Sequence, residues 1–186
     1  MSVAGQLDGI RAELRAAQAG IAALAAKTSD DAWTRRPKSG GWSAAECIAH
    51  LTMTSDVYLE LFDAADDAAH DAHDAPTLPA RYRMGFGAWL LAKFLEPPGR
   101  FRSRTIPAFI PDAAAPKAST VASFAMSQDA LLRWIDSHST RPLNAMLITS
   151  PFNARMKYNA YAALRVIAAH QRRHFWQAER AARGVP

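Results

Sequence analysis

The fold is decided first by residues 3–27, which read VAGQLDGIRAELRAAQAGIAALAAK. Apolar side chains recur there with alternating steps of four and three residues, at Val3, Leu7, Ile10, Leu14, Ala17, Ile21 and Leu24. This spacing gives a helix one apolar stripe and is typical of a helix packed along the seam of a bundle. We therefore predict a first helix over about residues 2–27.

Three further long helices are indicated by caps and breakers. Ser43 and Glu46 supply a capping box for a second helix, which the pattern carries to about Ala69. A third helix is expected over about residues 118–137. A last one is expected over about residues 157–183, because Gly184 and Pro186 then end the helical pattern. Four long helices predict an all-α fold, a four-helix bundle.

The stretch 70–117 contains most of the prolines and cannot form one long helix. We predict a long crossover there, with a short extra helix over about residues 84–95. This crossover is a candidate cover for a substrate pocket, with Tyr82, Arg83, Phe86 and Trp89 as candidate lining residues. The length of 186 residues predicts a single domain over residues 1–186.

Composition narrows the class of protein. With 49% hydrophobic and 21% charged residues, the chain resembles an ordinary soluble globular protein. The single cysteine, Cys47, excludes an intramolecular disulfide and a cysteine-based zinc cluster, so we expect the reducing cytoplasm. No apolar run approaches the roughly 18 residues of a membrane span. The net charge is +5, but the basic residues are dispersed, so we expect no nucleic-acid partner.

Three histidines are candidate metal ligands. His170 and His174 are four residues apart and lie about 40° apart around a helix axis, on its alanine-rich face. His50 lies on the apolar face of the second helix. Three inward imidazoles from two helices match the ligand preference of zinc, with an open fourth position.

The histidines also have a simpler interpretation. An inward histidine is often a neutral core residue whose ring nitrogens are hydrogen bonded. Taken alone, the residues favour that interpretation for His50 and leave the pair His170 and His174 evenly balanced between the two.

Other residues are weaker candidates. Glu46 is a candidate catalytic base, although its place in a capping box already explains it. His70 and His73 lie in a charged stretch that we interpret as a solvated loop. Cys47 lies beside His50 on the helical wheel and is interpreted as a small buried residue rather than a nucleophile. The remaining aromatic candidates are interpreted as core or capping residues: Trp33, Trp42 and Trp176.

Two signatures and the run between them resemble a known family. Residues 41–51, GWSAAECIAHL, resemble the tryptophan–serine, glutamate and histidine–leucine signature of the DinB/YfiT-like superfamily. Residues 168–180, AAHQRRHFWQAER, resemble its closing HxxxH helix, and SPFNARMKYNAYAALRVIAAH, residues 150–170, resembles the approach to that helix. The spacing of the signatures and the helix order agree, so the resemblance covers essentially the whole chain.

The resemblance implies an up-down-down-up bundle, a homodimer, and a divalent-metal site made by His50, His170 and His174. Zinc is the metal we expect first, with nickel and manganese as alternatives. Relatives include bacillithiol and mycothiol S-transferases and a maleylpyruvate isomerase. We therefore expect a metal-dependent enzyme of the thiol S-transferase type, with a small-molecule substrate such as a low-molecular-weight thiol. A metal-dependent hydrolase and a non-catalytic metal-binding or dimerisation module are the alternatives.

Overall fold

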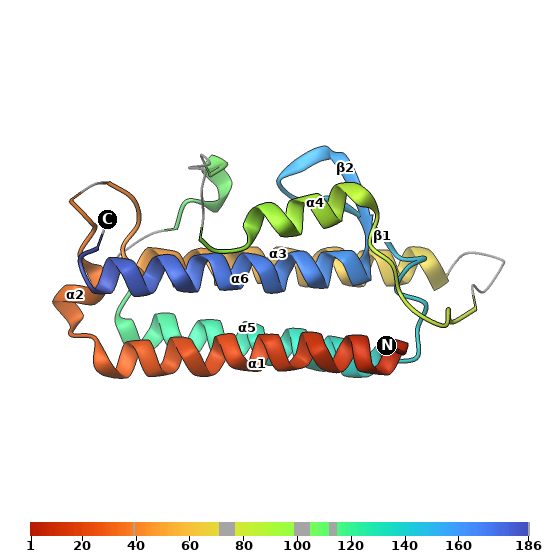
Figure 1. The fold of residues 1–186 in the computed structure, drawn as a ribbon, viewed down its shortest axis with the longest axis horizontal. Helices are drawn as coiled ribbons and strands as arrows, with labels where there is room; N and C mark the ends of the chain where they lie inside the picture. Colours follow the sequence, from red (N-terminus) through yellow and green to blue (C-terminus); the bar gives the residue numbers. More distant parts are fainter. Residues whose placement is uncertain (39, 71–76, 99–104, 112–114, 186) are drawn as a thin grey trace.

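Four long helices form the body of the molecule (Figure 1). The computed structural model describes all residues except 39, 71–76, 99–104, 112–114 and 186. The long helices are α1 (Val3–Lys27), α3 (Ala44–His70), α5 (Lys117–Ser137) and α6 (Ala160–Ala182). The shorter elements are α2 (Asp30–Thr34), α4 (Phe86–Leu95), the 3₁₀ turn η1 (Pro107–Phe109), β1 (Leu147–Ser150) and β2 (Asn153–Asn159). The predicted all-α fold is confirmed.

Contacts between the long helices give their directions. Two helices are parallel when successive contacts move toward the C-terminus of both. Helix α1 is parallel to α6, because Gln6 contacts Tyr161 and Glu13 contacts Arg165. Helix α3 is parallel to α5, because Asp56 contacts Ser127 and Asp66 contacts His138. Helix α1 is antiparallel to α5, because Arg11 contacts Asp136 whereas Gln18 contacts Asp129. The order of directions is therefore up-down-down-up, as the colours of Figure 1 also show.

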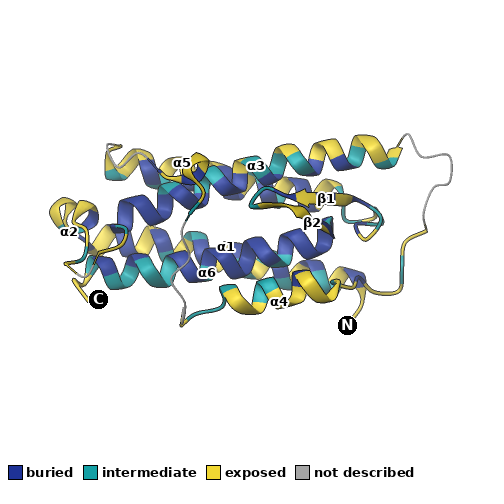
Figure 2. Ribbon diagram, turned by 90° about the horizontal axis from the view of Figure 1, so that it is seen from above, coloured by how far each residue is buried: buried dark blue, intermediate teal, exposed yellow. Residues whose placement is uncertain are grey.

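The apolar stripe of α1 faces the interior, as its spacing predicts. All seven of its members are buried, and Ser2 caps the helix by accepting a hydrogen bond from the backbone N–H of Gly5 at 3.3 Å. Helices α5 and α6 pack against this stripe, and both also pack against α3. Figure 2 shows the buried residues on the facing sides of the helices. None of the helices in the described part of the chain is long and apolar enough to cross a membrane.

The last long helix begins at Ala160, so the predicted start near residue 157 was wrong. The residues before it form an antiparallel hairpin of β1 and β2, in which Ile148 lies opposite Tyr158. Both side chains are buried, which favours an extended chain over a further helical turn here. Asn159 then caps α6, because its side-chain oxygen accepts a hydrogen bond from the backbone N–H of Ala162 at 2.8 Å.

Helix α2 was also missing from the sequence predictions. Ser29 caps it by accepting a hydrogen bond from the backbone N–H of Ala32, and its first turn carries two acidic residues, which suit a helix N-terminus. The helix places Trp33 in the core with no exposed surface. It therefore closes the end of the bundle where α1 passes to α3.

A pair of buried amides links α5 to α6 through the core. Gln128 donates to the side-chain oxygen of Gln171 at 3.0 Å, Gln171 donates back at 2.6 Å, and Gln128 also donates to the carbonyl of Leu14 at 2.8 Å. Both glutamines are almost fully buried. Each side-chain oxygen therefore accepts its hydrogen bond from the other amide.

We expect Gln128→Leu to lower the free energy of unfolding by about 2 kcal/mol, because it leaves the Gln171 amide buried without its partner. The double variant Gln128→Leu/Gln171→Leu should lose less than the two single variants together, since no amide is then left unpaired. Urea denaturation of the four proteins measures both effects. Strictly additive losses would show that the two amides are not coupled.

Candidate metal centre

His50 on α3 and His170 and His174 on α6 lie together inside the bundle. One ring nitrogen from each lies within 4.8 Å of the other two, and the Nε2 atoms of His50 and His170 are 3.2 Å apart. All three residues are buried, with at most 9% of their surface exposed. The antiparallel contact between α3 and α6 thus joins two sequence signatures that lie far apart in the chain.

The backbone of the crossover orients His50. Its Nδ1 lies 2.8 Å from the carbonyl oxygen of Phe109, which can only accept, so Nδ1 carries the proton and donates. The lone pair of Nε2 is then directed toward His170. Histidines that bind metals are commonly oriented in this way by a hydrogen bond from the other ring nitrogen.

The donor set fits a divalent metal. By hydrogen-bond geometry the buried Nδ1 of His174 has no partner among the residues that the structure describes, although the Gln177 side chain acts on the ring and raises its pKa against the effect of burial. Buried polar atoms seldom lack a partner, and a cation would satisfy this nitrogen. Two nitrogens bound to a tetrahedral zinc ion at about 2.0–2.1 Å lie about 3.4 Å apart. The distance of 3.2 Å between His50 and His170 is close to that value.

Burial keeps the three imidazoles neutral. Burial, together with the charges of His50 and Arg173, lowers the pKa of His170 to about 3. The pKa of His174 is lowered well below its ordinary value, mainly by burial and then by the other two histidines. For His50, burial outweighs the hydrogen bond to Phe109 and also lowers the pKa. A neutral imidazole has the free lone pair that a metal requires.

Trp42 covers the histidine cluster. Its ring centroid is 4.8 Å from that of His50 and 5.7 Å from that of His174, and its plane is nearly parallel to the latter ring. The preceding Gly40 and Gly41 have φ angles of 80° and 114°, which favour glycine. Sequence reasoning assigned Trp42 to the core or a cap. The two glycines before it were the signal for a turn that places the indole over the histidines.

A cavity of about 1000 Å³ opens beside the histidines. Its apolar lining comes from α4, the segment before and after η1, the hairpin and α6, and includes Leu91, Phe94, Ile106, Ile110, Phe152 and Met156. The crossover therefore does contribute to a pocket, as expected, although through other residues than predicted. Tyr82, Arg83, Phe86 and Trp89 are not among the described lining residues, and Tyr82 instead binds the carbonyl of Arg141.

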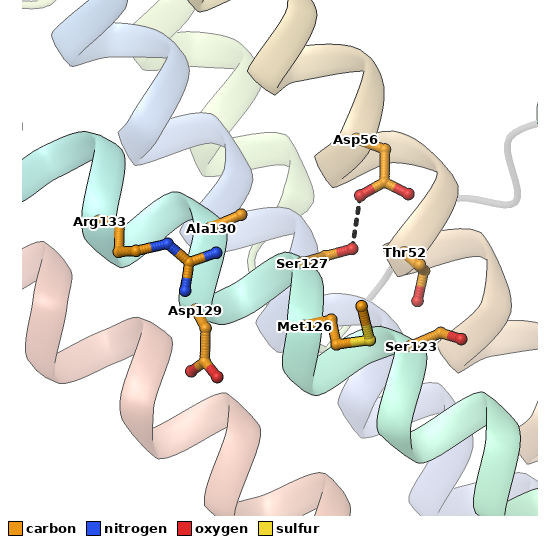
Figure 3. A pocket seen from close by; sticks show the side chains of 8 residues that line it. All are labelled: Thr52, Asp56, Ser123, Met126, Ser127, Asp129, Ala130 and Arg133. Atoms are coloured by element: carbon orange, nitrogen blue, oxygen red, sulfur yellow. Dashed lines mark hydrogen bonds between the residues drawn. The ribbon is translucent and has the colours of Figure 1, made fainter.

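A second hollow, of about 640 Å³, lies between α3 and α5 (Figure 3). Asp56 and Ser127 point toward one another across it, and the Ser127 hydroxyl donates to the carboxylate. Met126 lies at its edge with 72% of its surface exposed. The two cavities share none of their described lining residues, so the histidine centre opens only into the first of them.

The comparison with known families agrees with this arrangement. The family model of the DinB superfamily matches residues 13–178, which include all three histidines. The chain belongs to the DinB superfamily. No curated protein and no solved structure matches it. Membership in the DinB superfamily therefore supports the three-histidine site, and a substrate has to be argued from the site itself.

In this DinB protein Glu46 forms the predicted capping box. Its carboxylate accepts hydrogen bonds from the backbone N–H of Ser43 at 2.9 Å and from the Ser43 hydroxyl at 3.0 Å, and its own N–H donates to that hydroxyl. Arg36 pairs with the same carboxylate. Burial alone would raise the pKa of Glu46, but the hydrogen bonds from Arg36 and Ser43 outweigh it and lower the pKa. Glu46 is not among the described lining residues of the cavity.

We expect Glu46→Ala to lower the free energy of unfolding by about 2–3 kcal/mol, because the backbone N–H of Ser43 and the side chain of Arg36 lose the carboxylate that accepts their hydrogen bonds. Glu46→Gln should lose about half as much, since glutamine also closes a capping box. Metal content should stay unchanged in both variants, measured by elemental analysis beside urea denaturation. If Glu46→Gln instead keeps its stability and loses metal-dependent turnover, Glu46 is the catalytic base that the sequence suggested.

Among the described residues, the remaining sequence candidates do not join the three-histidine group. Cys47 is buried at the lining of the cavity, and burial followed by the charge of Glu46 raises the pKa of its thiol far above the ordinary value. His70 ends α3, and His73 falls outside the described residues. Trp176, expected in the core or at a cap, lines the cavity instead.

Proposed function

We propose that this DinB protein is a metal-dependent enzyme of the thiol S-transferase type, with zinc held by His50, His170 and His174. One observation carries the proposal. Three buried imidazoles line an open cavity, and no fourth histidine, cysteine or acidic ligand joins them among the described residues. Structural zinc sites are usually closed by four protein ligands, whereas catalytic sites keep one position for water or substrate.

A divalent metal in this site would lower the pKa of a thiol and so supply a thiolate at neutral pH. In the transfer, the sulfur forms a bond to an electrophilic carbon, and the leaving group departs with the electron pair of the bond that breaks. The thiol proton passes to solvent through the open side of the cavity. Phe109 holds the ring of His50 in place, and Trp42 and the apolar walls limit the water around the reacting atoms.

The activity is tested with protein loaded separately with zinc, nickel and manganese. Each form is given a panel of low-molecular-weight thiols with a chlorodinitrobenzene acceptor, whose conjugates absorb light. We expect conjugation that requires both metal and protein and that is absent in His170→Ala. The transferase proposal fails if none of the loaded forms conjugates any thiol.

A hydrolase is the second enzymatic candidate, and one observation argues against it. No carboxylate is among the described residues that line the cavity, so none of them is placed to take a proton from an attacking water. Ester and amide substrates offered without any thiol separate the two activities. Turnover of these substrates alone would favour the hydrolase.

The non-catalytic alternative is a module whose metal only stabilises the fold. It predicts a fourth protein ligand and a large rise in melting temperature on loading, without turnover of any substrate. The homodimer that the resemblance implies stays a prediction, which the molar mass from light scattering tests. We propose the cytoplasm as the location, because low-molecular-weight thiols are kept reduced there.

A further inference from the structure

The cavity beside the histidines has one polar side and several apolar ones. Helix α6 supplies the polar side with His170, Arg173, Gln177 and Arg180, whose spacing of three and four residues places them along one stripe. The facing walls come from the C-terminal half of α4 and from the hairpin, and their side chains are mainly apolar. A ligand that fills this space meets polar groups along one edge and apolar groups along the other.

The charged side chains are of one sign among the described residues that line the cavity. Among the described lining residues the charged side chains are Arg173 and Arg180, and neither aspartate nor glutamate occurs. A divalent metal at the three neutral histidines adds further positive charge. A cationic ligand would be repelled by this arrangement, whereas an anionic one would be attracted.

Arg173 and Arg180 make different contacts. Arg173 is buried, donates to the backbone carbonyl of Phe94 at 3.2 Å and lies over the ring of Phe94, so it ties α4 to α6. Arg180 is only half-buried, and its guanidinium lies 4.9 Å from the ring centroid of Trp176. It makes no ion pair within the described part of the chain. Its planar group is therefore held by an aromatic face while its N–H donors stay available to a ligand.

We propose that the cavity binds a small amphiphile with a single carboxylate, which pairs with Arg180 while its apolar body lies beside Trp176 and Trp42, between Arg180 and the histidines. This proposal rests on the proposed function and names its substrate class. Arg180 follows His174 by six residues, which is about 9 Å along the helix axis. An aromatic ring with a short side chain spans that length, so the reactive end of the substrate reaches the histidines while its carboxylate reaches Arg180. A guanidinium binds a carboxylate through two parallel hydrogen bonds.

The test compares 3-phenylpropanoate with its neutral isostere, 3-phenylpropanamide, on the full-length protein with and without zinc. Binding is followed by calorimetry and by the fluorescence of the tryptophans, of which Trp42 and Trp176 line the cavity. We expect the carboxylate to bind about tenfold more tightly than the amide, or better, in both metal states. Arg180→Gln should remove this preference and leave the affinity for the amide unchanged.

Arg183→Gln is the matched control, because Arg183 lies at the same end of α6, is exposed and is not among the described lining residues. It should keep the preference for the carboxylate. Equal binding of the two probes by the wild-type protein, failure of both to bind, or a preference that survives Arg180→Gln would each overturn the proposal. A preference that is lost in His170→Ala and kept in Arg180→Gln would also overturn it, since the metal would then hold the carboxylate. No thiol or turnover enters these measurements, so failure of the transferase assay leaves their outcome unaffected.

Discussion

Replacing His170 by alanine will abolish stoichiometric metal binding. His170 is one of the three grouped ligands found among the described residues, and its Nε2 faces that of His50 at 3.2 Å. Loss of an outer hydrogen-bond partner of a metal ligand already weakens binding by about 10–100-fold, so loss of a ligand should cost about a hundredfold or more. Elemental analysis gives the metal content per chain, and calorimetric titration with zinc gives the affinity.

The matched control for this variant is His138→Ala. His138 lies at the end of α5, where it contacts Asp66, and it does not belong to the histidine group. It should retain one metal ion per chain. His50→Ala, which removes the ligand of the other helix, should behave like His170→Ala. A His170→Ala protein that folds and still binds zinc with wild-type affinity would show that the three histidines do not form the site.

Acidifying the metal-free protein will lower its free energy of unfolding steeply below about pH 6.5. The pKa of each of the three histidines is lower in the folded state than in the unfolded chain. The unfolded state therefore binds more protons as the pH falls, and stability is lost. Each histidine contributes at most about 1.4 kcal/mol per pH unit, so the three together reach about 4 kcal/mol per unit. For His170 the loss continues until its folded pKa of about 3.

Urea denaturation with a chelator at about pH 7.5, 6.5 and 5.5 measures this slope. Carboxyl groups with lowered pKa, such as Glu46 and Glu96, also destabilise the folded state in acid, but they act mainly below about pH 4.5. The interval between about pH 6.5 and 5.5 therefore isolates the histidines. The variant His170→Leu/His174→Leu should show a much shallower slope there. Constant stability of the wild-type protein across this interval would contradict neutral buried imidazoles.

Much of the fold was predictable because its signals are local. The stripe of α1 repeats over about six turns, and the capping box of α3 is complete within four residues, so each was visible in a short window of sequence. The hairpin was not predictable in this way. Its strands are short, and Ile148 and Tyr158 favour it through burial against the bundle, which only the folded chain provides.

The candidate site also contains residues that local sequence signals predict and contacts that exist only in the folded chain. The spacing of His170 and His174 placed them on one face of a helix, and the family resemblance added His50. The partner of His50 is the backbone carbonyl of Phe109, 59 residues away, and a backbone acceptor leaves no mark in the side-chain pattern. The places of Trp42 and Arg180 on the cavity likewise depend on how the turn and α6 pack against the other elements.

The hydrogen bond from His50 to the carbonyl of Phe109 couples the ordering of the turn at residues 107–109 to metal binding by the histidines. Whatever strengthens the bond also fixes the turn at residues 107–109, so metal loading should slow amide hydrogen exchange there. The coupling is reciprocal. If bound metal raises the affinity for a ligand that orders the turn, that ligand raises the affinity for the metal by the same factor. Substrate that enters against residues 105–110 would then protect the centre from losing its ion during turnover.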